Sequence, residues 1–487
     1  MVGTSILIII AVYFGLLYTI SYFIGRRHTD NDAFFLGNRK SPWWLVAIAM
    51  VGSSISGVTF VSVPGQVGVL DMTYMQMVLG FFVGYLIVAY VLLPLYYKLN
   101  LTTIYEYLHK RLGFQSYRTG ASFFILSKVV GAAVRLYLAV MILQALVFAR
   151  WGVPFWVTVT GVLLLIWIYT HKSGIKTILW TDLLQTSCMI GALILIIWQV
   201  VTQMDLSFGE AVATIADSKH ARIFVFDDWG SKQNFVKQFL SGIFITIVMT
   251  GLDQSMMQKN LTCKNPKDAQ KNMVSYGFAF IPINFLFLCL GILLLAFATQ
   301  KGITLPEKTD QILPMLATEY LGLPVLIFFT IGIIAAAFAS SDSALAALTT
   351  SVCVDLLDIG KKNEEEAKRI RKRVHIGMSV VFIFAILIIN ALNSTNVLDA
   401  IYTSASYTYG PLLGLFAFGL FTRRATKDRF VPYICVASPF LCFGITLLLE
   451  HFYGYTMGYE LLMMNGFLTF AGLMAMSSKQ RTAKLKL

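Results

Sequence analysis

Charged residues are scarce in this chain, and their scarcity excludes an ordinary soluble fold. Only 13% of the 487 residues are charged and 57% are hydrophobic, against roughly 25% and about 45–50% in soluble proteins. Apolar runs of about twenty residues, enough to cross a bilayer core, recur from Ser5 almost to the end. Because these runs are continuous, they also argue against a transmembrane β-barrel, whose strands alternate in polarity. The composition predicts an all-α, polytopic membrane protein.

The sequence also lacks the patterns of disulfide-rich, zinc-binding and most catalytic proteins. Its six cysteines form no close-spaced pairs and its six histidines are scattered singly, so neither a disulfide framework nor a transition-metal site is indicated. We find no phosphate-binding glycine loop, HExxH motif or Ser/His/Asp arrangement. No loop is long enough to form a soluble catalytic domain. We therefore expect a protein that is not an enzyme and that functions within the membrane.

Apolar segments separated by polar breaks predict about 13 transmembrane helices. They cover residues 4–24, 43–70, 74–97, 119–149, 154–170, 177–203, 234–257, 273–299, 322–352, 375–393, 396–421, 431–449 and 459–476. An odd number of crossings places the two termini on opposite sides of the membrane.

The distribution of basic residues predicts which side is which. No basic residue precedes the first segment and Arg26 and Arg27 follow it, the reverse of a cleavable signal peptide. With the N-terminus outside, 29 of the 38 Lys and Arg residues, Lys259 among them, fall on the cytoplasmic side, as the positive-inside rule requires. The net charge of +13 therefore indicates orientation in a cell membrane and contact with anionic lipid, and it does not indicate nucleic-acid binding. No obligate protein partner is evident.

Polar stretches interrupt two of the predicted spans at places where the backbone could line a site. Residues 52–59 hold four hydroxyls and two glycines, which either unwind the helix and free carbonyls for a cation or form a small-residue packing face. Residues 250–254 either unwind the seventh span or end it. Breaks at corresponding places in two halves are typical of inverted-repeat transporters. Residues 43–203 and 234–421 each contain five predicted spans and would insert in opposite orientations.

Several side chains within the spans are candidates for binding roles. Ser340 and Ser341, with a carbonyl one turn earlier, would suit a hard monovalent cation, although serines in helices also bond back to their own i−4 carbonyls. Ionisable residues inside spans are functional hypotheses by default, and they are Lys128, Arg135, Asp182, Asp253 and Asp342. Arg135 could clamp a substrate carboxylate or pair with a buried aspartate. Tyrosines beside Gly410-Pro411 could gate a pathway or simply pack; they are Tyr402, Tyr407 and Tyr409.

Together these features resemble the sodium:solute symporter family, which has the LeuT-type fold of two inverted five-helix repeats. The resemblance covers nearly the whole chain. It is carried by Gly57-Val58-Thr59-Phe60-Val61-Ser62-Val63-Pro64, Trp180-Thr181-Asp182, Asp253-Gln254 followed by Gln258-Lys259, Ser340-Ser341, and Gly410-Pro411 with the residues leading to Arg424. It implies an N-terminal anchor helix and loop (1–42), a first repeat (43–203), an outer loop (204–233), a second repeat (234–421) and two peripheral helices with a cytoplasmic tail (422–487).

Position by position, the resemblance implies a sodium site and a neighbouring substrate pocket. The common sodium site of the family falls on Gly52, Ile55, Ala337, Ser340 and Ser341. The substrate pocket falls on Ser54, Ser56, Thr59 and Thr250. Arg135 lies in the helix that supplies a carboxylate-binding arginine in sialic-acid members, about one turn out of register. A second sodium, held by some members, would use Asp182 and Ser343, but the next position, Ala344, has no hydroxyl.

The resulting hypothesis is a secondary active transporter that couples Na⁺ influx to uptake of a small polar organic solute by alternating access. The solute would be a sugar, a sugar acid such as sialic acid, or another carboxylate. The membrane potential contributes about 2.3 kcal/mol per charge per 100 mV to such coupling. A membrane channel and a transporter-like solute sensor are the alternatives. Flux that saturates and depends on both sodium and solute would exclude a channel, and a sensor would normally carry a signalling domain.

Overall fold

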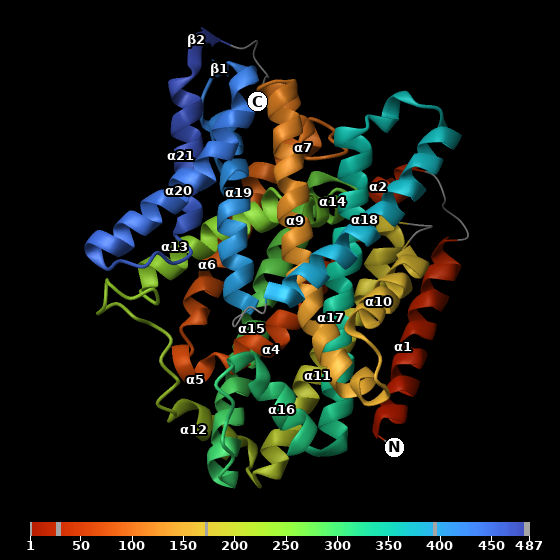
Figure 1. The fold of residues 1–487 in the computed structure, drawn as a ribbon, viewed down its shortest axis with the longest axis vertical. Coiled ribbons are helices and arrows are strands. Elements are labelled where there is room, and N and C mark those ends of the chain that lie inside the picture. The colour runs from red at the N-terminus through yellow and green to blue at the C-terminus, as the bar shows by residue number, and fades with distance from the viewer. Residues whose placement is uncertain (1, 26–30, 171–173, 393–396, 482–487) are drawn as a thin grey trace.

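The computed structural model describes residues 2–25, 31–170, 174–392 and 397–481, and this part of the chain is built almost entirely of helices. Figure 1 shows an upright bundle with α12 (Phe208–Ala216) and α16 (Ile312–Glu319) at one end. The antiparallel pair β1 (Arg424–Thr426) and β2 (Ser477–Arg481) lies at the other end. Within the described residues seven helices are long and apolar enough to span a membrane, or up to nine spans if each of two bent pairs is one span. The expectation of a multi-pass helical protein is confirmed.

The remaining helices follow the order of the chain. The first half contains α1 (Val2–Gly25), α2 (Asn31–Leu36), α3 (Trp43–Ser54), α4 (Gly57–Gly65), α5 (Val67–Leu70), α6 (Tyr74–Ile87), α7 (Leu93–Lys98), α8 (Glu106–Arg111), α9 (Phe114–Leu143), α10 (Phe155–Thr170) and α11 (Gly174–Gln203). The second half contains α13 (Phe235–Thr246), α14 (Gln254–Asn260), α15 (Pro266–Lys301), α17 (Gly322–Ser351), α18 (Glu364–Leu392), α19 (Val397–Phe421), α20 (Val431–Tyr453) and α21 (Leu461–Ala475).

Each of the 13 predicted segments coincides with one helix or with a run of consecutive helices, but several helices begin earlier than predicted. α9 begins at Phe114 rather than 119, α15 at Pro266 rather than 273, and α18 at Glu364 rather than 375. The hydropathy pattern detects only the apolar part of a helix, and capping residues extend it. At α15, Asn265 accepts a hydrogen bond from Asp268 N at 2.9 Å, and Pro266 occupies the first turn.

Two helices bend sharply where the polar stretches occur. α3 and α4 meet at 58° across residues 55–56, and α13 and α14 meet at 69° after a π-helical turn at Ile247–Gly251. The seventh predicted span therefore does not end at its polar stretch. It resumes as α14, whose N-terminus is capped by Asp253 Oδ1, which accepts hydrogen bonds from Ser255 N at 2.8 Å and Met256 N at 3.3 Å.

α17 forms the centre of the bundle. Every residue from 332 to 351 is buried, and most of them are alanine, serine or threonine, whose small side chains let neighbouring helices approach closely. α17 packs against α11, α9, α3 and α4. The break between α3 and α4 lies against it, since Ser53 Oγ donates a hydrogen bond to Ala339 O at 3.2 Å.

Candidate functional site

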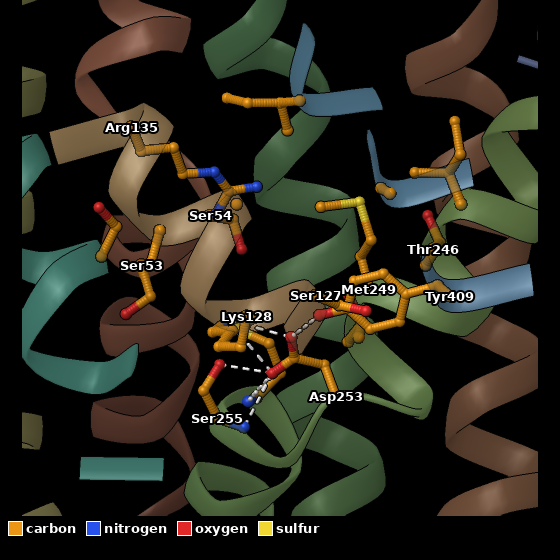
Figure 2. A pocket seen from close by; sticks show the side chains of 18 of the residues that line it. Ser53, Ser54, Ser127, Lys128, Arg135, Thr246, Met249, Asp253, Ser255 and Tyr409 are labelled. Atoms are coloured by element: carbon orange, nitrogen blue, oxygen red, sulfur yellow. Dashed lines mark hydrogen bonds and ion pairs between the residues drawn. The ribbon is translucent and has the colours of Figure 1, made fainter. Parts of the chain in front are cut away.

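A cavity of about 80 Å³, lined by both polar and apolar side chains, lies between the two bent helix pairs (Figure 2). α3, α6, α9, α13, α14, α15, α17 and α19 all contribute side chains to its wall. One buried water needs at least about 10–15 Å³ of such space, so the cavity is large enough to hold water. A solute of the size of a sugar acid would need the surrounding helices to move apart.

The predicted sodium ligands on α17 converge on one atom. Ser340 Oγ and Ser341 Oγ both donate hydrogen bonds to Ala337 O, at 3.0 and 2.7 Å. This is the back-bonding alternative that the sequence left open, and it also gathers the three predicted oxygen ligands of this helix around one point. All three residues are buried. A cation bound there would contact all three oxygens in place of these two hydrogen bonds.

The predicted ligands on the other helix lie at the break between α3 and α4. A helix ends with carbonyls that have no intrahelical donor, and here Ile55 N closes only the hydrogen bond to Val51 O, at 3.0 Å. The helix resumes after Ser56, whose carbonyl accepts from Phe60 N at 3.1 Å. Gly52 and Ile55 therefore sit at the ends of an interrupted hydrogen-bond ladder beside α17. Their coordination of sodium stays a prediction.

The predicted substrate residues divide into two groups. Ser54, Thr250 and Arg135 line the cavity. Ser54 Oγ lies 2.5 Å from Tyr276 OH, which is itself 2.7 Å from Tyr85 OH. Ser56 and Thr59 are buried, at 2% and 7% exposure, and are not part of the cavity wall in this conformation.

The second predicted basic residue, Lys128, is paired within the protein. Its Nζ lies 3.0 and 3.2 Å from the two carboxylate oxygens of Asp253. Asp253 also accepts hydrogen bonds from Tyr409 OH at 2.7 Å and Ser255 Oγ at 2.5 Å. Figure 2 shows these side chains converging on Asp253, with Arg135 apart from them. In the described part of the chain Arg135 makes no ion pair, and its buried Nε has no hydrogen-bond partner.

A tyrosine pair lies at the cavity wall. Tyr74 OH and Tyr402 OH lie 3.1 Å apart and join α6 to α19. Tyr402 and Tyr409 both line the cavity, whereas Tyr407 does not, and its ring packs against Phe443 of α20. Of the three candidate gate residues, the structure therefore brings two to the cavity.

Asp182, one of the two residues predicted for a second sodium, pairs with Lys259, which the count of basic residues placed on the cytoplasmic side. Asp182 Oδ2 lies 2.5 Å from Lys259 Nζ, and both side chains are 0% exposed. Ser343 Oγ lies 3.3 Å from Ser53 Oγ and donates to Ala339 O at 2.9 Å. Lys259 was counted among the cytoplasmic basic residues, which is wrong. The helix resumes after residue 253 and turns Lys259 into the interior.

Sequence reasoning missed Lys259, Ser53 and Tyr276 as members of the site. Two signals pointed towards Lys259. It stands in the Gln258-Lys259 motif of the family resemblance, and a carboxylate in a span, such as Asp182, needs a positive partner. Ser53 was visible only as one of the four hydroxyls in the polar stretch. Nothing in the pattern around Tyr276 distinguishes it from the other aromatic residues of α15.

Two broken helices beside a cavity in a helical bundle are typical of secondary transporters. Residues 34–429 match the sequence model of the sodium:solute symporter family, and the chain belongs to this family. It is therefore a multi-pass membrane protein that transports a solute by symport, with Na⁺ as the coupling ion.

Individual relatives are similar over most of the chain. The sodium/sialic acid symporter NanT of Aliivibrio fischeri is 25% identical over 437 residues, which cover 88% of this chain and 85% of that protein. The human sodium/iodide cotransporter is 26% identical over 414 residues, 82% of this chain and 62% of that protein. Among solved structures, a substrate-bound, outward-open Na⁺-coupled sialic acid symporter superimposes with a TM-score of 0.82 at 22% identity, covering 98% and 97% of the two chains. That likeness shows a shared fold.

Proposed function

We propose that the transported solute carries a carboxylate and that Arg135 binds it. The observation that carries this proposal is the state of the two basic side chains in the cavity wall. Lys128 is neutralised by Asp253, whereas Arg135 has no acidic partner within the described residues. Arg135 is half-buried, and its buried Nε has no hydrogen-bond partner among the described residues. A guanidinium binds a carboxylate through two parallel hydrogen bonds. A carboxylate solute would complete this charge arrangement.

The relatives are consistent with an anionic solute without specifying one. They include sodium/sialic acid symporters and sodium-coupled monocarboxylate transporters, at 24–25% identity, and also a sodium/glucose cotransporter at 22%. The carboxylate is therefore argued from Arg135, and sugar acids and short monocarboxylates are the first solutes to test.

Sodium would bind at Gly52, Ile55, Ala337, Ser340 and Ser341, between the α3/α4 break and α17. Ser54 in the cavity wall lies two residues from Gly52, so an ion that orders the break also orders the solute pocket. Coupling requires that ion and solute stabilise the same conformation. The inverted-repeat architecture of residues 43–203 and 234–421 is part of this proposal. It is supported by the two bent helix pairs, each of which is the first span of its five-span unit.

The proposal is tested by thermal-shift measurements on the purified protein with sialic acid, pyruvate, lactate, glucose and neutral amino acids, in NaCl and in choline chloride. We expect one or more carboxylates to raise Tm in NaCl and to have little effect without sodium. In Arg135→Gln the apparent affinity should fall at least tenfold, about 1.4 kcal/mol. Arg118→Gln is a matched control, because Arg118 is an exposed arginine on the same helix.

Two results would contradict the proposal. One is stabilisation by a neutral sugar that exceeds every carboxylate. The other is a carboxylate affinity that is equal in the wild-type protein and in Arg135→Gln. Either result leaves sodium coupling intact and removes Arg135 from the solute site.

A further inference from the structure

A second cavity, of about 500 Å³, lies between α6, α13, α19 and α21. All the residues in its wall are aliphatic, aromatic, methionine or glycine, so it offers water no hydrogen-bonding side chain, and apolar cavities of this kind stay dry. Phe421 and Phe467 of the wall are 82% and 67% exposed, so the cavity opens at the surface of the bundle. Because its four helices belong to predicted spans, this surface faces the hydrocarbon core of the bilayer. We call this space the apolar cavity.

The bent stretch 243–253 has a cavity on each of two sides. Thr246 and Thr250 line the cavity described above as the candidate site. Ile247 and Leu252 line the apolar cavity. The π-helical turn and the break that follows it therefore lack packing atoms on both sides, and an empty apolar space loses dispersion contacts. A hydrocarbon group that fills the apolar cavity would stabilise the bend.

The shape of the apolar cavity restricts what can fill it. α13 packs against α21, and α19 also packs against α21, so the space between these helices is narrower than a further helix of about 10 Å. A helix of a second copy or of another membrane protein does not fit there. A single acyl chain does, and acyl chains surround the protein at this depth of the membrane.

Two of the lining elements lead from the cavity to basic residues. Val91 lies in the cavity wall, and the same helical run ends in α7 at the exposed Lys98, two turns or about 10 Å further on. α19 leaves the wall at Phe421, and the exposed Arg423 follows. Figure 1 shows α7 and β1, which begins one residue after Arg423, at the same end of the bundle. Positive charges where the spans end attract anionic head groups.

We propose that the apolar cavity binds an acyl chain of an anionic phospholipid, and that this chain supports the bend of residues 243–253. The head group lies towards Lys98 and Arg423. Lipid thus acts on the helix that lines the solute cavity from the side opposite to the solute. The inference depends neither on the identity of the solute nor on the positions of the sodium ligands.

The experiment uses the purified full-length protein, freed of lipid in detergent, to which palmitoyl-oleoyl phosphatidylglycerol or phosphatidylcholine is added. We expect phosphatidylglycerol to raise Tm and to slow backbone hydrogen exchange in residues 243–253. Ala417→Phe places an aromatic ring in the apolar cavity, so both effects should fall by at least half. Ala437→Phe, which changes an exposed alanine on α20, should respond like the wild type.

The head group is tested by the double variant Lys98→Gln/Arg423→Gln. The wild type should show a larger Tm shift with phosphatidylglycerol than with phosphatidylcholine, whose chains are the same. The double variant should show equal shifts. Arg429→Gln is the control, because Arg429 is exposed in the following connection and outside the lining helices.

Three outcomes overturn the proposal. The first is a full response to lipid in Ala417→Phe or, if that variant does not fold, in Ala417→Leu. The second is a wild-type protein that responds equally to the two lipids. The third is a wild-type dimer that Ala417→Phe converts to a monomer, which would place a second copy of the chain at the cavity.

Discussion

At the scale of single residues, Asp253 has the largest number of polar contacts in the cavity wall. Its carboxylate is 2% exposed and accepts hydrogen bonds from α9, α14 and α19 through Lys128, Ser255 and Tyr409. It also caps α14. Asp253 thus joins α14 to α9 and α19. Its ion pair with Lys128 neutralises its buried negative charge.

Removing one member of this pair should cost more than removing both. We expect Lys128→Met to destabilise the protein by about 3–5 kcal/mol, because it leaves Asp253 as a buried, uncompensated charge. The double variant Lys128→Met/Asp253→Asn should recover part of that loss. Thermal unfolding of the three proteins, followed by circular dichroism, measures the interaction energy. Equal losses in Lys128→Met and in the double variant would show that the pair is not coupled.

The two serines of α17 can be tested in the same way for sodium binding. Ser340→Ala/Ser341→Ala should weaken Na⁺ affinity at least tenfold, since it removes two of the five proposed oxygen ligands. Ser187→Ala is the matched control, because Ser187 makes the same i−4 bond, to Leu183 O at 2.8 Å, but is exposed on α11. Sodium-dependent shifts in Tm provide the measurement. Wild-type affinity in the double variant would rule the site out.

These residues show how much of the site could be predicted from the sequence. Hydroxyls and glycines in apolar runs indicated Gly52, Ser340 and Ser341, because polar groups at mid-membrane depth need a reason to be there. The partners of Asp182 and Asp253 could not be predicted, since a pairing such as Lys259 with Asp182 joins residues 77 positions apart. Such a pairing depends on the direction in which α14 continues after the break, and the sequence around the break does not predict that direction.

At the scale of elements, α6 and α13 approach each other more closely than side chains allow. A Cβ atom added at Gly80 would lie 2.2 Å from Phe239 O, and one added at Gly242 would lie 2.3 Å from Met77 O. The two glycines face each other across the crossing, as small residues do where membrane helices touch backbone to backbone. This contact joins α6, which follows the bent pair α3/α4 in the chain, to α13, the first helix of the bent pair α13/α14.

Gly242→Ala should therefore force α6 and α13 apart. We expect a loss of about 1–3 kcal/mol, the usual cost of overpacking, together with weaker Na⁺-dependent stabilisation because α13 leads into the cavity. Gly161→Ala on α10 is the control, since an added Cβ there meets nothing within 4 Å. Thermal unfolding with and without NaCl compares the two variants. Equal Tm values would mean that the crossing adapts.

Element types were easier to predict than element ends and bends. The apolar runs predicted the helices because a spanning helix needs about twenty apolar residues. The polar stretch at 250–254 left two interpretations open, and only the cap provided by Asp253 shows that the helix continues as α14. Three tyrosines in the span that forms α19 were predicted as candidate gates. Tyr402 and Tyr409 are two helical turns apart and so share a face, whereas Tyr407 faces α20.

At the scale of the whole molecule, the described chain begins and ends at opposite ends of the bundle. Figure 1 shows the start of α1 towards the end that holds α12 and α16, and β2 at the other end. This arrangement agrees with an odd number of crossings. Together with the distribution of Lys and Arg, it predicts residues 204–233 outside the cell and residues 353–374 in the cytoplasm.

Single cysteines introduced into these two loops test the orientation. Lys219→Cys should react with a membrane-impermeant maleimide in intact cells, whereas Lys361→Cys should react only after permeabilisation. Both positions are exposed, and the parent protein controls for its six native cysteines. Labelling in the reverse order would invert the predicted topology.

The single sodium site proposed at Ser340 and Ser341 has an energetic consequence for the cell. If one mobile cation accompanies one monoanionic solute, the loaded complex carries no net added charge and its translocation is electroneutral. The membrane potential then contributes nothing to accumulation. Uptake would be limited by the ratio of sodium concentrations alone, about tenfold for a tenfold gradient, equivalent to about 1.4 kcal/mol. Depolarising proteoliposomes while holding the sodium gradient constant would leave the final solute ratio unchanged.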